Sequence, residues 1–316
     1  MTEVSLELAP ERQAVGSSRA VMTRHGKTFR MASRLLKEAD AEAVFDLYAF
    51  CRYLDDLVDE GRGPGREAEL DAVTRELAAG RSSRTHVAAF IRRAHEVGMP
   101  IELPLLLIEG MRSDLGPVEF ESEDRLIRYA YCVAGTVGLM FSHLVGVQDR
   151  RAWPYAIDLG IGMQLTNIAR DVLEDARRGR VYLPADWLGG PIAAESIADP
   201  GARTRERVAL AVERTVATAR RYYASADAGM PWLPYRARLA ALSASRCYER
   251  IGLELVREGT CWERGRHRVP PLRRARVAVS SLLFQGFGTW FHDRPHEPVL
   301  HRALHGLPGV RVPART

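Results

Sequence analysis

Long apolar runs are missing from this 316-residue sequence, which has no stretch close to the roughly 20 residues that a membrane-spanning helix needs. We therefore do not expect an integral membrane protein. Residues 1–20 carry charges throughout and lack the apolar core and cleavage site of a signal peptide. We expect them to form a disordered lead-in.

Cysteine is scarce as well. The sequence has four cysteines, which lie far apart and form no CxxC pair: Cys51, Cys132, Cys247 and Cys261. This pattern favours reduced thiols in the cytoplasm, and we expect neither disulfides nor structural zinc.

Nucleic-acid-binding motifs are absent too. The net charge of +5 would suit nucleic acid, an anionic membrane surface or a polyanionic substrate. However, there is no zinc finger, no RNP-like aromatic motif and no long Lys/Arg block, and the basic residues are mostly Arg scattered among acids. We expect no nucleic-acid partner.

Alternating β-branched runs are rare, whereas apolar residues recur at spacings of three and four along almost every long segment. This periodicity predicts an all-α fold. The breaks between segments are short, so we expect one helical domain over residues 21–290 and a loosely ordered tail over 291–316. The expected helices span 30–38, 40–60, 66–79, 84–97, 101–115, 122–147, 150–177, 203–228, 234–258 and 271–289.

The segment CRYLDDLVDE (51–60) places several acidic side chains at the end of an otherwise apolar helix. Successive helical residues rotate by roughly 100°, which puts one polar set on a single face: Tyr48, Arg52, Asp55 and Asp59. Asp55 and Asp59 repel each other, with Cβ atoms roughly 5–6 Å apart. Acids at a helix C-terminus also oppose the helix dipole, so helix stability does not explain them.

A second segment, QLTNIARDVLEDARRGR (164–180), repeats the pattern with a polar stripe of Gln164, Asn167, Asp171 and Asp175. One DxxxD could equally be a solvated helix face. Two copies on apolar helices favour a binding site instead.

Carboxylate and amide oxygens in this number suit Mg²⁺ or Mn²⁺, and Mg²⁺ commonly binds through carboxylates together with phosphate oxygens. A di-iron bundle would need Glu-x-x-His pairs, and none of the nine histidines has a glutamate three residues before it. Magnesium and a diphosphate in an apolar helical cavity indicate ionisation of an allylic diphosphate, with the cavity wall holding the hydrocarbon and excluding water.

Four stretches in order resemble the squalene and phytoene synthase family over residues 24–270. They are RHGKTFRMASRLL (24–36), YLDDLVDE (53–60), YAYCVAGTVG (129–138) and QLTNIARDVLEDARRGRVYLP (164–184). The resemblance implies a single-domain isoprenoid-synthase-type helical bundle with a central apolar cavity. It also implies prenyl diphosphate substrates and two to three Mg²⁺ or Mn²⁺ ions bound with the diphosphate.

The resemblance assigns roles by position. The implied metal ligands are Asp55, Asp56, Asp59, Asn167, Asp171 and Asp175. The implied catalytic side chains are Tyr48, Arg52, Tyr129 and Arg170. The implied substrate-binding residues are His25, Lys27, Thr28, Phe29, Ser33, Val133, Ala134, Gly138, Gln164, Asn167 and Tyr182.

The amino-acid sequences of these motifs are most similar to those of the bacterial phytoene branch of the family. This implies head-to-head condensation of two geranylgeranyl diphosphates through prephytoene diphosphate to phytoene, without NADPH. The small Ser33, one helical turn beyond Phe29, favours a C20 tail. A C15 synthase making dehydrosqualene, squalene or presqualene diphosphate and a non-catalytic lipid-binding homologue are the alternatives.

Two features stay open. The small residues of VAGTVG (133–138) would let either a substrate or a neighbouring helix approach closely. The segment LRRARVAVSSLLFQGFGTWF (272–291) is either a core helix with a basic lead or a peripheral contact with the inner face of the membrane.

Overall fold

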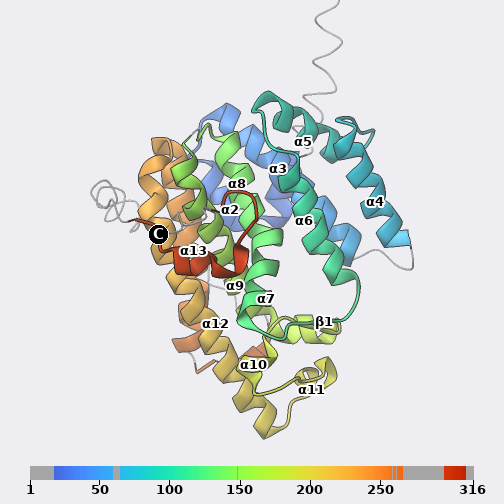
Figure 1. Ribbon diagram of the computed structural model, residues 1–316, viewed down its shortest axis with the longest axis vertical. Helices are drawn as coiled ribbons and strands as arrows, with labels where there is room; N and C mark the ends of the chain where they lie inside the picture. The colour runs from blue at the N-terminus through green and yellow to red at the C-terminus, as the bar shows by residue number, and fades with distance from the viewer. Residues whose placement is uncertain are drawn as a thin grey trace, which may run out of the picture.

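The computed structural model describes residues 18–59, 65–147, 149–257, 259–260, 262–265 and 295–310, and these residues are almost entirely helical (Figure 1). The all-α prediction is confirmed. The first helices are α2 (Lys27–Ser33), α3 (Glu38–Asp59), α4 (Gly65–Ala78), α5 (Thr85–Glu96), α6 (Glu102–Arg112) and the 3₁₀ turn η1 (Ser113–Leu115). They are followed by α7 (Glu123–Ala130), η2 (Tyr131–Gly135), α8 (Thr136–Leu144), η3 (Arg150–Ala152) and α9 (Trp153–Arg177). The last elements are α10 (Ala185–Leu188), α11 (Ala194–Ala198), α12 (Ala202–Gly229), η4 (Met230–Trp232), α13 (Tyr235–Arg257), η5 (Trp262–Arg264) and η7 (Pro298–Leu304).

Helix α9 is the central element. It packs against α8, α12, α13 and the π-helical turn η2, and it is buried on most of its faces. A helix that is apolar nearly all round belongs in the middle of a bundle. The polar stripe that the sequence shows on this helix therefore faces the interior of the protein.

The only strands among the described residues are a parallel pair of two residues each, β1 (Val118–Glu119) and β2 (Arg180–Val181). Val118 is paired with Arg180. This pairing holds the chain that leaves α9 beside the chain that leaves α6.

Two terminal regions differ from the expectation. The lead-in was expected to reach residue 20, but residues 18–25 are helical and Met22 is buried. The tail was expected to be loose, but residues 295–310 pack on the bundle and bury Leu300 and Leu304 (Figure 1). Burial of these apolar side chains outweighs the Pro and His content on which the expectation rested.

Two internal boundaries also differ. The helix expected over 30–38 is α2, which begins three residues earlier and ends five residues earlier, and the one expected over 122–147 contains the π-helical turn η2. The expected helix over 271–289 and the segment 272–291 lie outside the described residues. Within the described ranges, no helix combines the length and the apolar character needed to cross a bilayer.

Candidate active site

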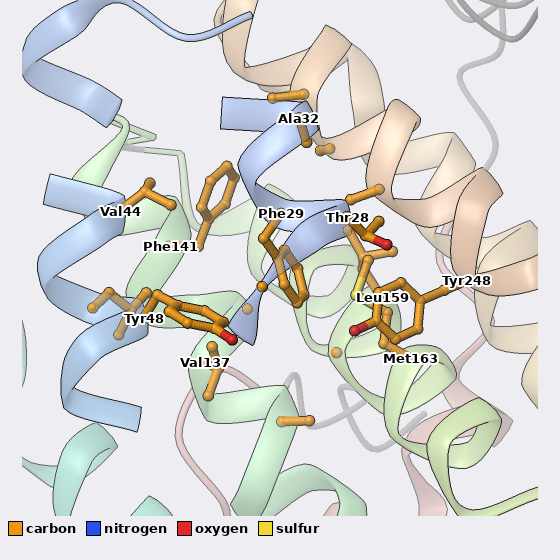
Figure 2. Close-up of a pocket in the computed structure, with 18 of the residues that line it drawn as sticks. Thr28, Phe29, Ala32, Val44, Tyr48, Val137, Phe141, Leu159, Met163 and Tyr248 are labelled. Carbon is orange, nitrogen blue, oxygen red and sulfur yellow. The ribbon is translucent and has the colours of Figure 1, made fainter. Parts of the chain in front are cut away.

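Helices α2, α3, α8, α9 and α13, together with η2, enclose a cavity of about 680 Å³. Most of its wall is apolar or aromatic, as Figure 2 shows for Phe29, Tyr48, Phe141 and Tyr248. The ring of Phe29 lies between those of Tyr48 and Tyr248, with centroid distances of 6.0 and 5.6 Å. The cavity can hold a hydrocarbon chain and present aromatic faces to it.

Helix α3 contributes a polar stripe to this wall. Tyr48, Arg52 and Asp55 line the cavity, as their shared helical face predicts. Asp55 is exposed to the cavity but enclosed by protein on its other sides. This desolvation, with repulsion from Asp59 and Asp56, raises the pKa of Asp55 to about 7 although Arg52 acts in the opposite direction.

Arg52 forms an ion pair with Asp56 one turn along the helix. Burial, reinforced by the neighbouring Tyr248, raises the pKa of Tyr48 to about 12. The phenol of Tyr48 is therefore neutral and can donate a hydrogen bond into the cavity.

Helix α9 contributes the second stripe from the opposite side. Gln164, Asn167 and Arg170 line the cavity, and Arg170 donates to the adjacent Asp171 at 2.7 Å. The side chain of Asn167 donates to Gln164 at 3.4 Å, and its carbonyl oxygen Oδ1 is buried without a hydrogen-bond partner. An unpartnered buried oxygen beside carboxylates is a suitable metal ligand.

Asp175 lies one turn beyond Asp171. Burial and repulsion from Asp171 raise the pKa of Asp175 to about 8 although Arg180 and Arg178 act in the opposite direction. Asp55 and Asp175 are thus crowded carboxylates on two helices. Such groups hold divalent cations well, because a cation removes the repulsion between them.

Asp59 has a different environment. Its carboxylate accepts from Arg178 at 2.7 Å and from Arg180 at 2.8 Å. Burial alone would raise the pKa of Asp59, but the hydrogen bonds and charges of Arg180 and Arg178 outweigh it and lower the pKa. These contacts with the two arginines connect the end of α3 to the end of α9. They have to break before Asp59 can bind a metal.

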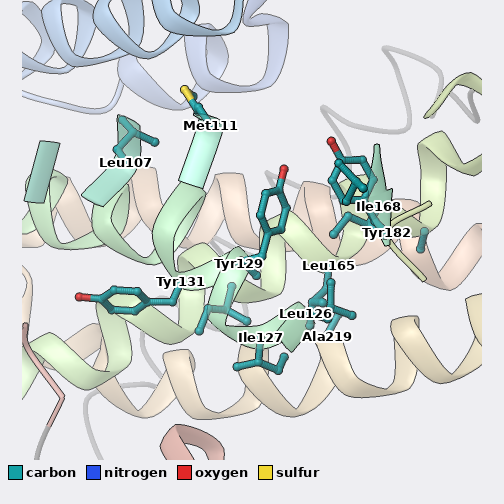
Figure 3. Packing of buried hydrophobic residues seen from close by; sticks show 14 of the residues in the cluster. Leu107, Met111, Leu126, Ile127, Tyr129, Tyr131, Leu165, Ile168, Tyr182 and Ala219 are labelled. Atoms are coloured by element: carbon teal, nitrogen blue, oxygen red, sulfur yellow. The ribbon is translucent and has the colours of Figure 1, made fainter. Parts of the chain in front are cut away.

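Tyr129, expected at the reacting centre, and Tyr182, expected to bind substrate, are not among the described residues that line the cavity. Both hydroxyls donate to Asp114, each at 2.8 Å, and Figure 3 shows them pointing to the same side. Their rings lie 5.2 Å apart. In this structure the two phenols therefore hold a carboxylate beside the cavity instead of facing into it.

Asp114 was missed by the sequence reasoning. Burial raises its pKa although hydrogen bonds from Tyr182 and Tyr129 oppose the shift. Repulsion from Asp114 also contributes to the raised pKa values of Asp55 and Asp175. A lone acid after α6 gave no local signal, because its two tyrosine partners are 15 and 68 positions away.

The N-terminal motif forms one end of the cavity. The five residues expected to bind substrate here all line it: His25, Lys27, Thr28, Phe29 and Ser33. A Cβ atom at Gly26 would lie 2.8 Å from the ring of Tyr48. Glycine at this position thus lets the tyrosine ring pack against the backbone.

The small residues of VAGTVG have both of the roles that the sequence left open. Val133, Ala134 and Gly138 line the cavity, while a Cβ at Gly138 would lie 2.1 Å from the carbonyl oxygen of Ala156 on α9. The reciprocal contact occurs at Gly160, whose Cβ would lie 2.1 Å from the carbonyl oxygen of Ala134. The two cavity walls are therefore in backbone contact.

Helix α13 was not expected to contribute to the site. Ala240, Ala241, Ala244, Tyr248 and Ile251 line the cavity from this helix. Their spacing of three and four is the signal of a helix face, but it is the same for a core face and for a cavity wall.

These residues fit magnesium bound with a diphosphate. Asp55 and the free oxygen of Asn167 supply hard oxygen ligands at the cavity, and Arg52 and Arg170 supply cations for phosphate oxygens. The other expected metal ligands, Asp56, Asp59, Asp171 and Asp175, are not among the described residues that line it.

The comparison with known protein families decides the relationship. The model of the squalene/phytoene synthase family matches residues 22–276. The chain belongs to the squalene/phytoene synthase family. Members of this family act on prenyl diphosphates, and family membership is compatible with the use of divalent metal ions.

Curated relatives in this family cover most of the chain. It is 35% identical over 274 residues to a 15-cis-phytoene synthase of Enterobacter agglomerans, covering 81% of this chain and 90% of that protein. It is 33% identical over 305 residues to a 15-cis-phytoene synthase of Paracoccus, covering 92% and 96%. Among solved structures, a dehydrosqualene synthase in complex with ligand superposes with a TM-score of 0.77 at 25% identity, covering 87% of this chain and 97% of that one.

Proposed function

We propose that the chain is a phytoene synthase that condenses two geranylgeranyl diphosphates head to head and releases two diphosphates. The observation that carries this proposal is the similarity to 15-cis-phytoene synthases over nearly their whole length. The cavity supports it, because an apolar chamber lined by Asp55, Arg52 and Arg170 suits a prenyl diphosphate.

Different side chains bind the metal ions and the diphosphate in this proposal. Bound Mg²⁺, held by Asp55, Asp171, Asp175 and Asn167, would neutralise the charge that builds on diphosphate as its bond to carbon breaks. Arg52 and Arg170 bind diphosphate oxygens, exchanging the carboxylates that they now hold for the substrate. Asp56 and Asp59 are the further ligands in this proposal.

The first half-reaction takes place against the aromatic wall. Loss of one diphosphate leaves an allylic cation, and the double bond of the second substrate attacks it and loses a proton to form the cyclopropane prephytoene diphosphate. Phe29 and Tyr248 present ring faces to the cation, and the apolar wall limits the access of water to it.

In the second half-reaction the remaining diphosphate leaves, the cyclopropylcarbinyl cation rearranges, and a proton is lost to give phytoene. The neutral phenol of Tyr48 donates a hydrogen bond to the departing diphosphate. The released diphosphate is a base for the proton in the same chamber. No reductant is needed, so we expect no requirement for NADPH.

The test is a product assay with purified protein and Mg²⁺. Geranylgeranyl or farnesyl diphosphate is offered, each with and without NADPH, and the hydrocarbon is identified by mass. A C40 product from the C20 substrate without NADPH is expected. A C30 product from farnesyl diphosphate would show that the chain is a C15 synthase instead. The structural similarity to a dehydrosqualene synthase favours this alternative. Metal-independent lipid binding without turnover would support the non-catalytic alternative.

A cytoplasmic location with peripheral contact at the inner face of the membrane is also part of the proposal. Cys51 and Cys132 are free thiols, in line with a reducing compartment. Liposome flotation of the chain with and without residues 271–316 tests the contact. Equal flotation would reject this region as the anchor.

A further inference from the structure

Asp158 is a fully buried carboxylate outside the cavity lining, on the N-terminal half of α9. Its Oδ1 lies 2.8 Å from His301 Nε2, and its Oδ2 lies 3.0 Å from His296 Nε2. Ser225 on α12 donates to Oδ2 at 2.5 Å. Two imidazoles from the end of the chain and one carboxylate from the central helix thus converge on one point.

This cluster is separate from the candidate active site. Asp158 precedes Asp171 by 13 residues, which corresponds to about 20 Å along a helix. One ligand atom from each of Asp158, His296 and His301 lies within 4.8 Å of the other two. In the described part of the chain it is the single group of three such side chains.

The three side chains are packed against one another. Asp158 is fully buried, and both imidazoles present Nε2 to its carboxylate. The centroids of the two imidazole rings are only 4.3 Å apart. A buried carboxylate needs a positive partner nearby, and a cation held between these rings would supply it.

We propose that Asp158, His296 and His301 bind a divalent cation of intermediate hardness, with Zn²⁺ as the best candidate. The bound ion would attach the segment 295–310 to α9. Two imidazole nitrogens and one carboxylate oxygen are the ligands that such ions take. The active-site stripes, which offer oxygen alone, suit a harder ion. Zinc was not expected from the sequence because that expectation rested on the cysteines.

The separations are close to what this assignment needs. Two ligand atoms at about 2.1 Å from one tetrahedrally coordinated ion lie about 3.4 Å apart. The observed separations between imidazole nitrogens and carboxylate oxygens are 2.8 and 3.0 Å, so the side chains move apart by about half an ångström when the ion replaces the hydrogen bonds. Ser225 orients the carboxylate, and the rings of Tyr155 and His296 meet nearly at right angles at a centroid distance of 5.5 Å. Such outer partners keep ligands in position before the ion binds.

The ion would hold distant parts of the chain together. His296 and His301 belong to the segment 295–310, which is also held through backbone carbonyls: Tyr222 donates to that of Leu300 and Tyr131 to that of Pro308. On α9 the neighbours of Asp158, Ala156 and Leu159, line the cavity. A clamp at Asp158 therefore braces the cavity wall from outside, and its role is structural.

The experiment uses the full chain without a polyhistidine tag. The protein is stripped with chelator, given zinc in the presence of excess Mg²⁺, and freed of unbound metal, and bound zinc is then measured by mass spectrometry. The variants are His296→Gln, His301→Gln and the double variant. Glutamine keeps a hydrogen-bond donor but loses the imidazole ligand. The matched control is His305→Gln, an exposed histidine of the same segment.

We expect about one zinc per chain in the wild type and in the control, and a loss of most of it in the double variant. Zinc should also raise Tm by several degrees in the wild type and leave the double variant unchanged, since an ion that binds only the folded state stabilises it. Cobalt in place of zinc should give visible absorption bands that the double variant lacks. These readouts are independent of enzyme activity.

Two results would overturn the proposal. One is a wild type that retains no zinc, and the other is a double variant that retains as much as the wild type. In either case the cluster is a hydrogen-bonded latch. An Asp175→Asn variant separates the two metal sites, because its zinc content should stay at the wild-type level.

Discussion

Gly138→Ala is the substitution whose effect follows most directly from the geometry. A methyl group here would lie 2.1 Å from the carbonyl oxygen of Ala156, whereas ordinary contact begins at 3.4 Å. Helices α8 and α9 would have to separate by 1.3 Å, the difference between these two distances. The obstacle is backbone and cannot rotate away, so the substitution falls at the upper end of overpacking costs, about 3 kcal/mol.

For a chain of 316 residues that cost corresponds to a fall in Tm of about 4–5 °C, measured by differential scanning calorimetry at one scan rate. Both helices also carry cavity-lining residues, so product formation should fall together with stability. The matched control is Gly65→Ala, because nothing lies within 4 Å of a Cβ added there. A Gly138→Ala variant as stable as this control would refute the close approach of the two helices.

Three further outcomes are expected. Asp175→Asn should lower kcat at least about 100-fold while the circular dichroism spectrum is unchanged. Chelation of Mg²⁺ should abolish turnover of the wild type. Activity that survives both changes would contradict the metal assignment. Asp114→Asn should lower Tm, because each tyrosine loses a charged acceptor worth about 1.5–3 kcal/mol; an unchanged Tm would show that the hydrogen bonds of Tyr129 and Tyr182 contribute nothing. Burial lowers the pKa of His143, so the unfolded chain takes up this proton first and stability falls as pH drops below about 6.5. His143→Phe should therefore flatten the fall in Tm between pH 7 and 5, and equal slopes would contradict this reasoning.

The sequence by itself determined the helices and the faces of the two acidic stripes. Helical geometry is local, so the residues at positions 48, 52 and 55 had to share a face, and they line the cavity together. The four motifs indicated the family for the same reason, because each lies within a few neighbouring elements.

Contacts between distant residues could be decided only by the tertiary structure. Asp59 looked equivalent to Asp55 on its helix, yet it is held by Arg178 and Arg180, more than 100 residues away. Tyr129 looked catalytic from its motif, yet it points at Asp114. The hydrogen-bond partners of Asp158 lie 67 to 143 positions away from it in the sequence.

No local pattern encodes such pairs, because which charge meets which depends on how the helices pack. The sequence therefore determined which side chains are available and on which helix face each one lies. The tertiary structure decided which of them stay open to a ligand and which are held by another side chain. The reason is that burial and the nearest opposite charge determine the pKa of each carboxylate and whether it can bind a ligand.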